Sequence, residues 1–267
     1  MEAFIALLPP VTPQTIYIYA IVGGFLPPMF WLTFFLREDK KNPEPRRVIL
    51  GSFLFGCLSA IFAIPFQGLF ALLFPGASLL IGIIVFATVE ELSKYFSVRI
   101  SAMRDAANDE PIDPIIYMLT AAIGFAAMEN TLYLIDYLND FDLMNSLLER
   151  GKRFFGATLL HIISSVFVGI SLTLSYGKRK KWRPLLLPIG MACAVALHSL
   201  FNVFVTGSGS RDVFFGFLTI WIAFIITLIG LEFLKDYIRD YLQKREIEEK
   251  QTAGEPLVSN PFGELSR

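Results

Sequence analysis

Long apolar stretches recur along the chain, and they restrict the folds that it can adopt. A helix needs about 20 mostly apolar residues to cross the hydrocarbon core of a bilayer, where each backbone polar group must find its partner inside the protein. Hydrophobic residues make up 54% of the 267 positions and charged residues 18%, which is too apolar for a soluble domain of this size. We therefore expect an all-α polytopic membrane protein with about seven transmembrane helices. The qualifying stretches are residues 15–36, 48–74, 78–98, 114–138, 154–176, 184–206 and 213–234.

The distribution of Lys and Arg predicts how these helices are oriented. The loops 37–47 and 177–183 each contain five Lys or Arg residues, and such loops stay on the cytoplasmic side. The N-terminus is then outside and the C-terminus cytoplasmic, in the inner cell membrane of a bacterium or archaeon. Arg150, Lys152 and Arg153 fall on the outer side and are the exception to this topology. The net charge of −1 implies no global electrostatic partner and argues against nucleic acid. The apolar composition makes membrane lipid an expected partner.

Several ionisable residues lie deep inside the apolar stretches, among them Glu90, Glu91, Glu129, His161 and His198. An ionised carboxylate costs roughly 2.5 kcal/mol or more at the centre of a bilayer, so these groups need partners. At 1.5 Å per residue, Glu90 lies about 18 Å from the outer end of its helix. Glu129 and the two histidines lie about 12–14 Å from theirs. Because four helices place polar groups at a similar depth, we expect these groups to form one functional site.

Helical spacing predicts which neighbours support these groups. Residues four apart share a helix face, so Lys94 should pair with Glu90 or extend its ammonium toward the cytoplasmic interface. By the same rule Asn202 shares a face with His198. We expect Asn202 to orient His198 or to donate a hydrogen bond to a reacting oxygen.

Two chemistries suit this set of residues. Two histidines and one or two carboxylates are typical ligands of catalytic zinc. We expect Glu129, His161 and His198 to hold the metal and Glu90 to be the general base. Without a metal, Glu90 would activate a water directly, and His198 with Asn202 would stabilise the oxyanion. Both versions predict hydrolysis of an amide bond buried in the membrane.

Four motifs in this order resemble the PrsW family of bacterial intramembrane proteases, a relative of the CPBP/Abi group that includes the CAAX prenyl endopeptidases. The resemblance covers roughly residues 20–206. The motifs are Glu90-Glu91-x-x-Lys94, Phe125-x-x-x-Glu129-Asn130, a lone His161, and His198-x-x-x-Asn202.

The resemblance implies a membrane-embedded endopeptidase that cuts a membrane-anchored protein, such as an anti-sigma factor, in a site-1-type cleavage on the extracytoplasmic side. It also implies that Glu90 and Glu91 are catalytic acids and that His198 acts with Asn202. Glu129 stands where the CAAX enzymes have histidine, which argues against prenylated substrates.

Two other functions remain open at this point. Intramembrane acids and histidines also suit a proton-coupled transporter, and a non-catalytic membrane binding or immunity protein could share the fold. We assign residues 1–234 to a transmembrane catalytic domain. Residues 235–267 form a polar cytoplasmic helix extension that ends in a disordered tail from about residue 251.

Overall fold

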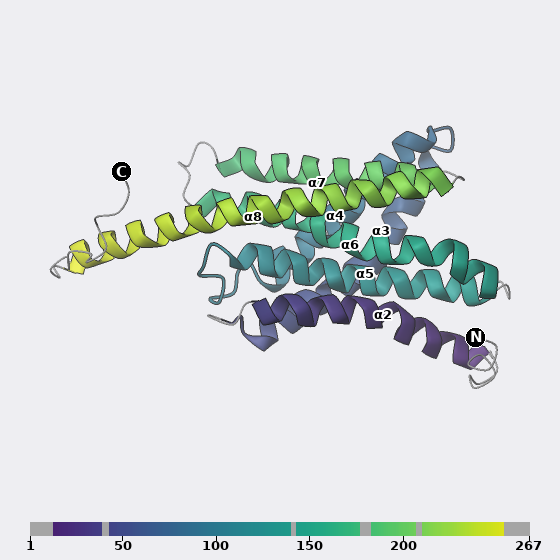
Figure 1. The fold of residues 1–267 in the computed structure, drawn as a ribbon, viewed down its shortest axis with the longest axis horizontal. Helices are drawn as coiled ribbons and strands as arrows, with labels where there is room; N and C mark the ends of the chain where they lie inside the picture. Colours follow the sequence, from purple (N-terminus) through teal and green to yellow (C-terminus); the bar gives the residue numbers. More distant parts are fainter. Residues whose placement is uncertain (1–12, 39–42, 140–142, 177–182, 207–209, 254–267) are drawn as a thin grey trace. The chain divides into compact units, whose positions relative to one another are not determined.

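The computed structural model describes residues 13–38, 43–139, 143–176, 183–206 and 210–253. Within these ranges the chain forms seven helices and no strands, which confirms the all-α prediction (Figure 1). The helices are α2 (Pro13–Glu38), α3 (Arg46–Leu73), α4 (Leu79–Ser101), α5 (Asp113–Asn139), α6 (Leu143–Tyr176), α7 (Arg183–Thr206) and α8 (Ser210–Ala253).

Six of these helices are long and apolar enough to cross a membrane. The exception is α4, which has 23 residues but carries Glu90, Glu91 and Lys94 in its second half. Its length of about 35 Å still exceeds the thickness of the hydrocarbon core. The chain is therefore a multi-pass membrane protein, and the orientation of its termini stays a prediction.

The described chain divides into two compact units, Met1–Ile225 and Ile226–Arg267, so the boundary falls inside α8. The predicted division at residue 234 was drawn on composition alone and stays a prediction. Residues 254–267, most of the predicted disordered tail, lie outside the described residues. All residues of the candidate site belong to the first unit.

Helix α5 lies between α2 and α6 and also packs against α3 and α4 (Figure 1). Its backbone approaches α3 so closely that two glycines are required at the contact. A Cβ atom on Gly56 would lie 2.2 Å from the carbonyl oxygen of Ala121, and one on Gly124 would lie 2.1 Å from that of Phe53. Small residues at helix interfaces allow this approach in membranes, and here they fix α3 against the helix that carries Glu129.

The Gly56→Ala substitution should lower the free energy of unfolding by about 1–3 kcal/mol, because the added methyl group forces α3 away from α5. Gly68→Ala, in the same helix, is the matched control, since its added Cβ would meet no atom within 4 Å. Thermal unfolding in detergent measures both. Equal melting temperatures for the two variants would contradict this account of the α3–α5 contact.

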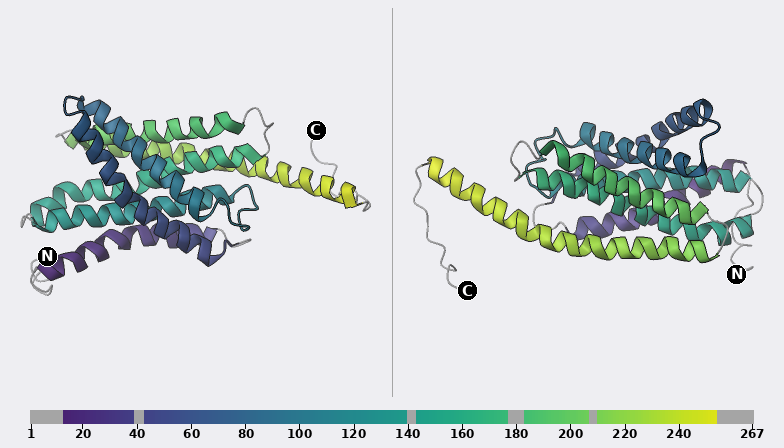
Figure 2. Two further views of the ribbon diagram at one scale, coloured as in Figure 1. Left: turned by 180° about the vertical axis from the view of Figure 1, so that it is seen from behind. Right: turned by 90° about the horizontal axis from the view of Figure 1, so that it is seen from above.

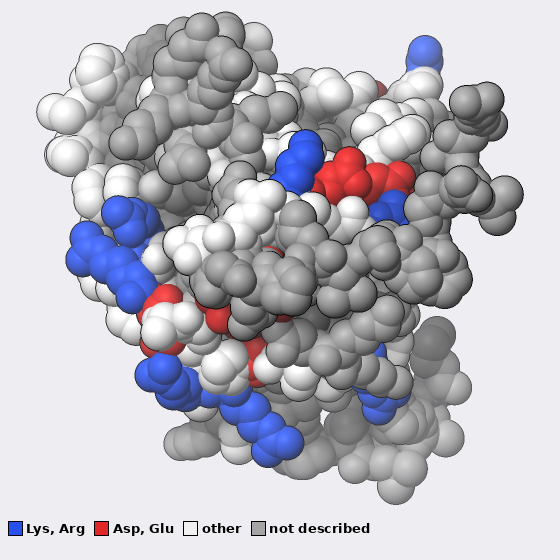
Figure 3. All heavy atoms as spheres, turned by 90° about the vertical axis from the view of Figure 1, so that its left-hand side faces the viewer, with Lys and Arg blue, Asp and Glu red and all other residues white. Residues whose placement is uncertain are grey.

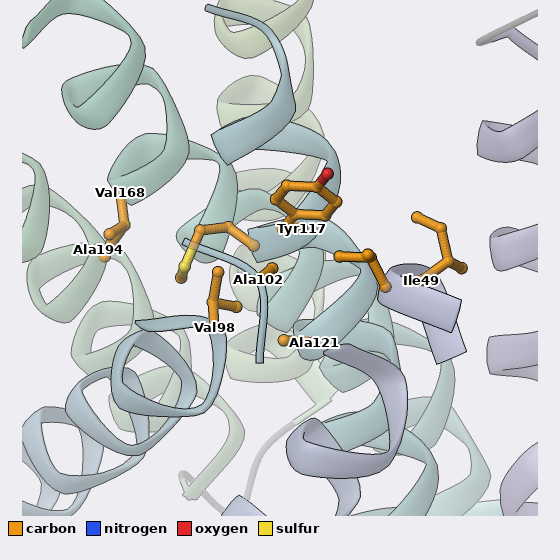
Figure 4. Packing of buried hydrophobic residues seen from close by; sticks show 9 residues of the cluster. Ile49, Val98, Ala102, Tyr117, Ala121, Val168 and Ala194 are labelled. Atoms are coloured by element: carbon orange, nitrogen blue, oxygen red, sulfur yellow. The ribbon is translucent and has the colours of Figure 1, made fainter. Parts of the chain in front are cut away.

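A cluster of buried apolar side chains packs several helices against one another (Figure 4). Val98 lies one helical turn after Lys94 on α4 and packs in this cluster with Tyr117 and Ala121 of α5. Val168 and Ala194 extend the cluster to α6 and α7. With Ile49 of α3, the cluster joins five helices in one core.

Charged and hydrogen-bonded polar side chains gather at one end of the bundle. Both views of Figure 2 place the turn between α3 and α4 at one end and the segment between α4 and α5 at the other. At the latter end Arg47 forms an ion pair with Asp105 at 2.9 Å, and the Tyr117 hydroxyl donates to Glu44. Figure 3 shows Lys, Arg, Asp and Glu side chains across this face of the molecule. This end is the one predicted to face the cytoplasm.

Candidate functional site

Glu91 joins three helices through one oxygen atom. Its side chain is completely buried, and its Oε1 accepts hydrogen bonds from Lys94 Nζ at 2.6 Å and Ser164 Oγ at 2.9 Å. His198 Nδ1 lies 2.7 Å from the same oxygen. Since a carboxylate can only accept, we assign the proton of His198 to Nδ1. Helices α4, α6 and α7 therefore meet at Glu91.

Lys94 pairs with Glu91, so the prediction that it pairs with Glu90 or reaches the interface is wrong. A lysine side chain can contact either the third or the fourth preceding residue, and here the fully buried carboxylate needs the charge most. Lys94 Nζ also lies 3.2 Å from His161 Nδ1. Because an ammonium group only donates, His161 Nδ1 accepts and its Nε2 donates to Glu129 Oε2 at 2.6 Å.

Glu90 is buried and holds one oxygen without a hydrogen bond. Its Oε1 accepts from Gln67 Nε2 of α3 at 2.9 Å. Within the described chain its Oε2 has no hydrogen-bond partner, and it lies 3.4 Å from His198 Nε2. With the His198 proton on Nδ1, its Nε2 presents a lone pair to Glu90 Oε2. Two acceptors that face each other in a buried site are expected to share a cation or a proton.

The donor atoms fit a divalent metal. One ligand atom from each of Glu90, His161 and His198 lies within 4.8 Å of the others. Two ligands bonded to a tetrahedral zinc at 2.0–2.1 Å stand about 3.3 Å apart, which matches the 3.4 Å between Glu90 Oε2 and His198 Nε2. The contact of Glu91 with His198 Nδ1 is the carboxylate–histidine pair that commonly orients a metal ligand. To bind through Nε2, His161 would have to release its hydrogen bond to Glu129.

A cavity of about 350 Å³ adjoins these groups. At about 30 Å³ for each water molecule it has room for roughly ten waters or a short peptide segment. It brings together five of the six predicted site residues, and Glu91 stands behind this lining, where it supports His198. The five lining residues are Glu90, Glu129, His161, His198 and Asn202.

Comparison with known proteins identifies the family. Residues 44–229 match the model of the PrsW family of intramembrane metalloproteases. The chain belongs to the PrsW family. It is 26% identical to Protease PrsW of Bacillus subtilis (strain 168) over 193 residues, which cover 70% of this chain and 84% of that protein. It is 34% identical to Protease PrsW of Geobacillus kaustophilus (strain HTA426) over 122 residues, covering 43% and 52% of the two chains.

Protease PrsW of Halalkalibacterium halodurans is 27% identical over 190 residues, covering 68% of this chain and 81% of that protein. No solved structure shows a significant match to the chain. Membership of the PrsW family confirms the expectation of a membrane-embedded peptidase and makes the transporter hypothesis unnecessary.

Two polar residues of this PrsW site were not predicted. Gln67 is the only amide side chain of α3, and a lone amide in an apolar membrane helix is a signal that could have found it. Ser164 gives no such signal, because Ser165 follows it and shares a helix face with His161.

A further hydrogen bond supports the Glu129-Asn130 motif, since Asn130 Nδ2 donates to Thr158 Oγ1 at 3.1 Å and connects α5 to α6.

The Gln67→Leu substitution should lower metal affinity or activity by about 10–100-fold, the usual cost of losing a group that orients a ligand. Leucine keeps most of the side-chain volume and removes the donor to Glu90 Oε1. Phe66→Leu, at an exposed neighbouring position of α3, is the control and should behave as wild type. Titration of the metal-free protein with zinc measures the affinity, and unchanged binding in Gln67→Leu would exclude this role.

Proposed function

We propose that this PrsW-family protein is an endopeptidase that cleaves a membrane-anchored protein, with zinc held by Glu90, His161 and His198. An anti-sigma factor, cut on the extracytoplasmic side, is the substrate class that the motif resemblance implies. The observation that best supports the zinc site is the buried Glu90 Oε2 facing His198 Nε2 at 3.4 Å. The matching donor set, two histidines and a glutamate, is a known ligand set of zinc hydrolases.

When bound, zinc would polarise the scissile carbonyl and lower the pKa of a nearby water to about 7. Glu129 is the best placed general base, because it lines the cavity and its side chain is 22% exposed, against 11% for Glu90. It would take the proton of the attacking water and pass it to the leaving nitrogen. The roles of Glu90 and Glu129 are thus exchanged relative to the sequence-based hypothesis.

The remaining residues would orient His198 and stabilise the charge that develops in the reaction. Glu91 holds the His198 ring in one tautomer, so that Nε2 faces the reaction centre. Asn202 lines the cavity four residues after His198, where its amide would donate to the developing oxyanion. Lys94 supplies the positive charge that keeps Glu91 ionised.

Metal analysis of the purified protein tests this proposal. Wild type should contain about one zinc per chain, and His161→Ala and His198→Ala should each lose it. Val203→Ala, at an exposed position of α7, is the control and should keep the metal. Absence of zinc from wild type purified without chelators would contradict the metal site and favour a glutamate-activated water.

A further inference from the structure

A row of polar side chains extends along α5 from the reaction centre, which we define as Glu90, Glu129 and His198. Glu129, Tyr133 and Asp136 all line the cavity, and their spacing of four and three residues places them on one face of the helix. Asp136 is the seventh residue after Glu129, and the rise of 1.5 Å per residue places it about 10 Å farther along the helix axis. The row therefore leads from the reaction centre toward the C-terminal end of α5.

A second polar row runs beside it on α7. His198, Asn202 and Thr206 also line the cavity and follow one another at intervals of four residues. Helices α5 and α7 run in the same direction through the bundle (Figure 1). Both rows therefore lead from the reaction centre to the same end, the one that holds the turn between α3 and α4.

Apolar side chains of α3 and α4 also line the cavity, beside Gln67 and Glu90 of the same helices. They are Ile64 of α3 and Ile83 and Phe86 of α4. These two α4 residues precede Glu90, so they too lie between the reaction centre and the α3–α4 turn. Between Glu90 and the α3–α4 turn, a chain segment would therefore meet Ile83 and Phe86 of α4 as well as the polar rows of α5 and α7.

The charge of the cavity selects what can occupy it. Three carboxylate residues line it, Glu90, Glu129 and Asp136, and no Lys or Arg does so among the described residues. The two charges of the proposed zinc would offset Glu90 and Glu129, so Asp136 supplies the remaining negative charge. Lys94 is fully buried behind the lining, against Glu91. A cleft with acidic residues and low-dielectric walls concentrates cations.

We propose that the two polar rows form an aqueous, anionic path to the reaction centre that receives a substrate segment with a basic side chain, bound by Asp136. This inference rests on the proposed peptidase function. An extended chain advances about 3.3 Å per residue, so 10 Å corresponds to about three residues. The substrate's Lys or Arg lies about three residues from the scissile bond, on the side that leads out of the membrane.

Cysteine labelling tests the path without any need for cleavage. In a Cys57→Ala, Cys193→Ser background, Asn202→Cys should react with a water-soluble methanethiosulfonate, and the adjacent Val203→Cys should not. Val203 is 39% exposed but does not line the cavity, so its thiol would face lipid, where the reactive thiolate does not form. Thr206→Cys repeats the test nearer the opening. Equal labelling of Asn202→Cys and Val203→Cys would overturn the path.

The charge of the reagent tests the selectivity. A trimethylammonium methanethiosulfonate should modify Asn202→Cys at least about tenfold faster than a sulfonate reagent of similar size. Asp136→Asn should reduce this preference, while Asp212→Asn, outside the cavity lining, should not. Equal rates for the two reagents would overturn the anionic character of the path.

Single-span reporters test the basic residue itself. A reporter with Arg three residues outside the scissile bond should be cut with a kcat/KM about tenfold or more above its Glu counterpart, and Asp136→Arg should reverse the order. Equal cleavage of the two reporters overturns the inference and leaves the peptidase function intact. Charge-selective labelling without cleavage of any reporter supports the path and counts against the proposed function.

Discussion

The Glu129→Gln variant should keep its zinc and lose about 10²–10⁴-fold in kcat/KM, which is the usual contribution of a general base. Glu90→Gln should lose both the zinc and the activity. The two substitutions are equal in size and remove one charge each. A difference in metal content between the two variants therefore distinguishes the metal ligand, Glu90, from the general base, Glu129. The structural reason is that Glu90 Oε2 faces His198 Nε2, whereas Glu129 is hydrogen-bonded to His161 and opens to the cavity.

Cleavage of a membrane-anchored reporter and metal analysis of the same preparations measure both effects. Glu232→Gln serves as the control, because its side chain is 74% exposed on α8 and should affect neither quantity. If Glu90→Gln retains full zinc and loses cleavage, Glu90 is the general base after all. The ligand role would then pass to Glu129, as in the hypothesis drawn from the sequence.

The Lys94→Met variant should unfold with a free energy about 3–5 kcal/mol lower than wild type, because it leaves the charge of Glu91 buried without a counter-charge. Both side chains are completely inaccessible to solvent. The double variant Glu91→Gln, Lys94→Met should recover most of this loss, since a neutral amide oxygen still accepts from Ser164 and His198. It should not recover activity, because the support of His198 by a carboxylate is gone.

The chain contains a matched control for this buried pair. Lys235 and Glu232 are also three residues apart and 2.7 Å from each other, but both are largely exposed. Lys235→Met should cost less than about 1 kcal/mol, as is usual for a surface ion pair. Unfolding followed by circular dichroism in one detergent compares the variants. A Lys94→Met protein as stable as Lys235→Met would show that Glu91 is neutral in the folded state.

The sequence was sufficient to predict the helices and the convergence of the site. Lipid forces apolar stretches into helices, so the spans could be read from composition. Residue counts along four of them placed Glu90, Glu129, His161 and His198 at similar depth. Depth is fixed by the rise of the helix, and the structure accordingly gathers these four residues around one cavity.

The pairing of the polar atoms could not be predicted in the same way. Lys94 can reach either Glu90 or Glu91 from its position on α4, and the choice depends on which carboxylate the neighbouring helices bury. Gln67 reaches Glu90 because α3 packs beside α4, and no spacing rule within α4 contains that information. Ser164 is chosen over Ser165 by the rotation of α6 about its axis, which the packing of the whole bundle sets.

The single oxygen at which Lys94, Ser164 and His198 converge has a consequence for when the site can assemble during folding. These contacts form only when α4, α6 and α7 have all packed together, because the three partners of Glu91 Oε1 come from these helices. Until then, the proposed zinc ligand His198 would lack the carboxylate that orients its ring. In the proposed mechanism, a newly made chain would therefore become active only after these three helices have packed, and not while it is still folding.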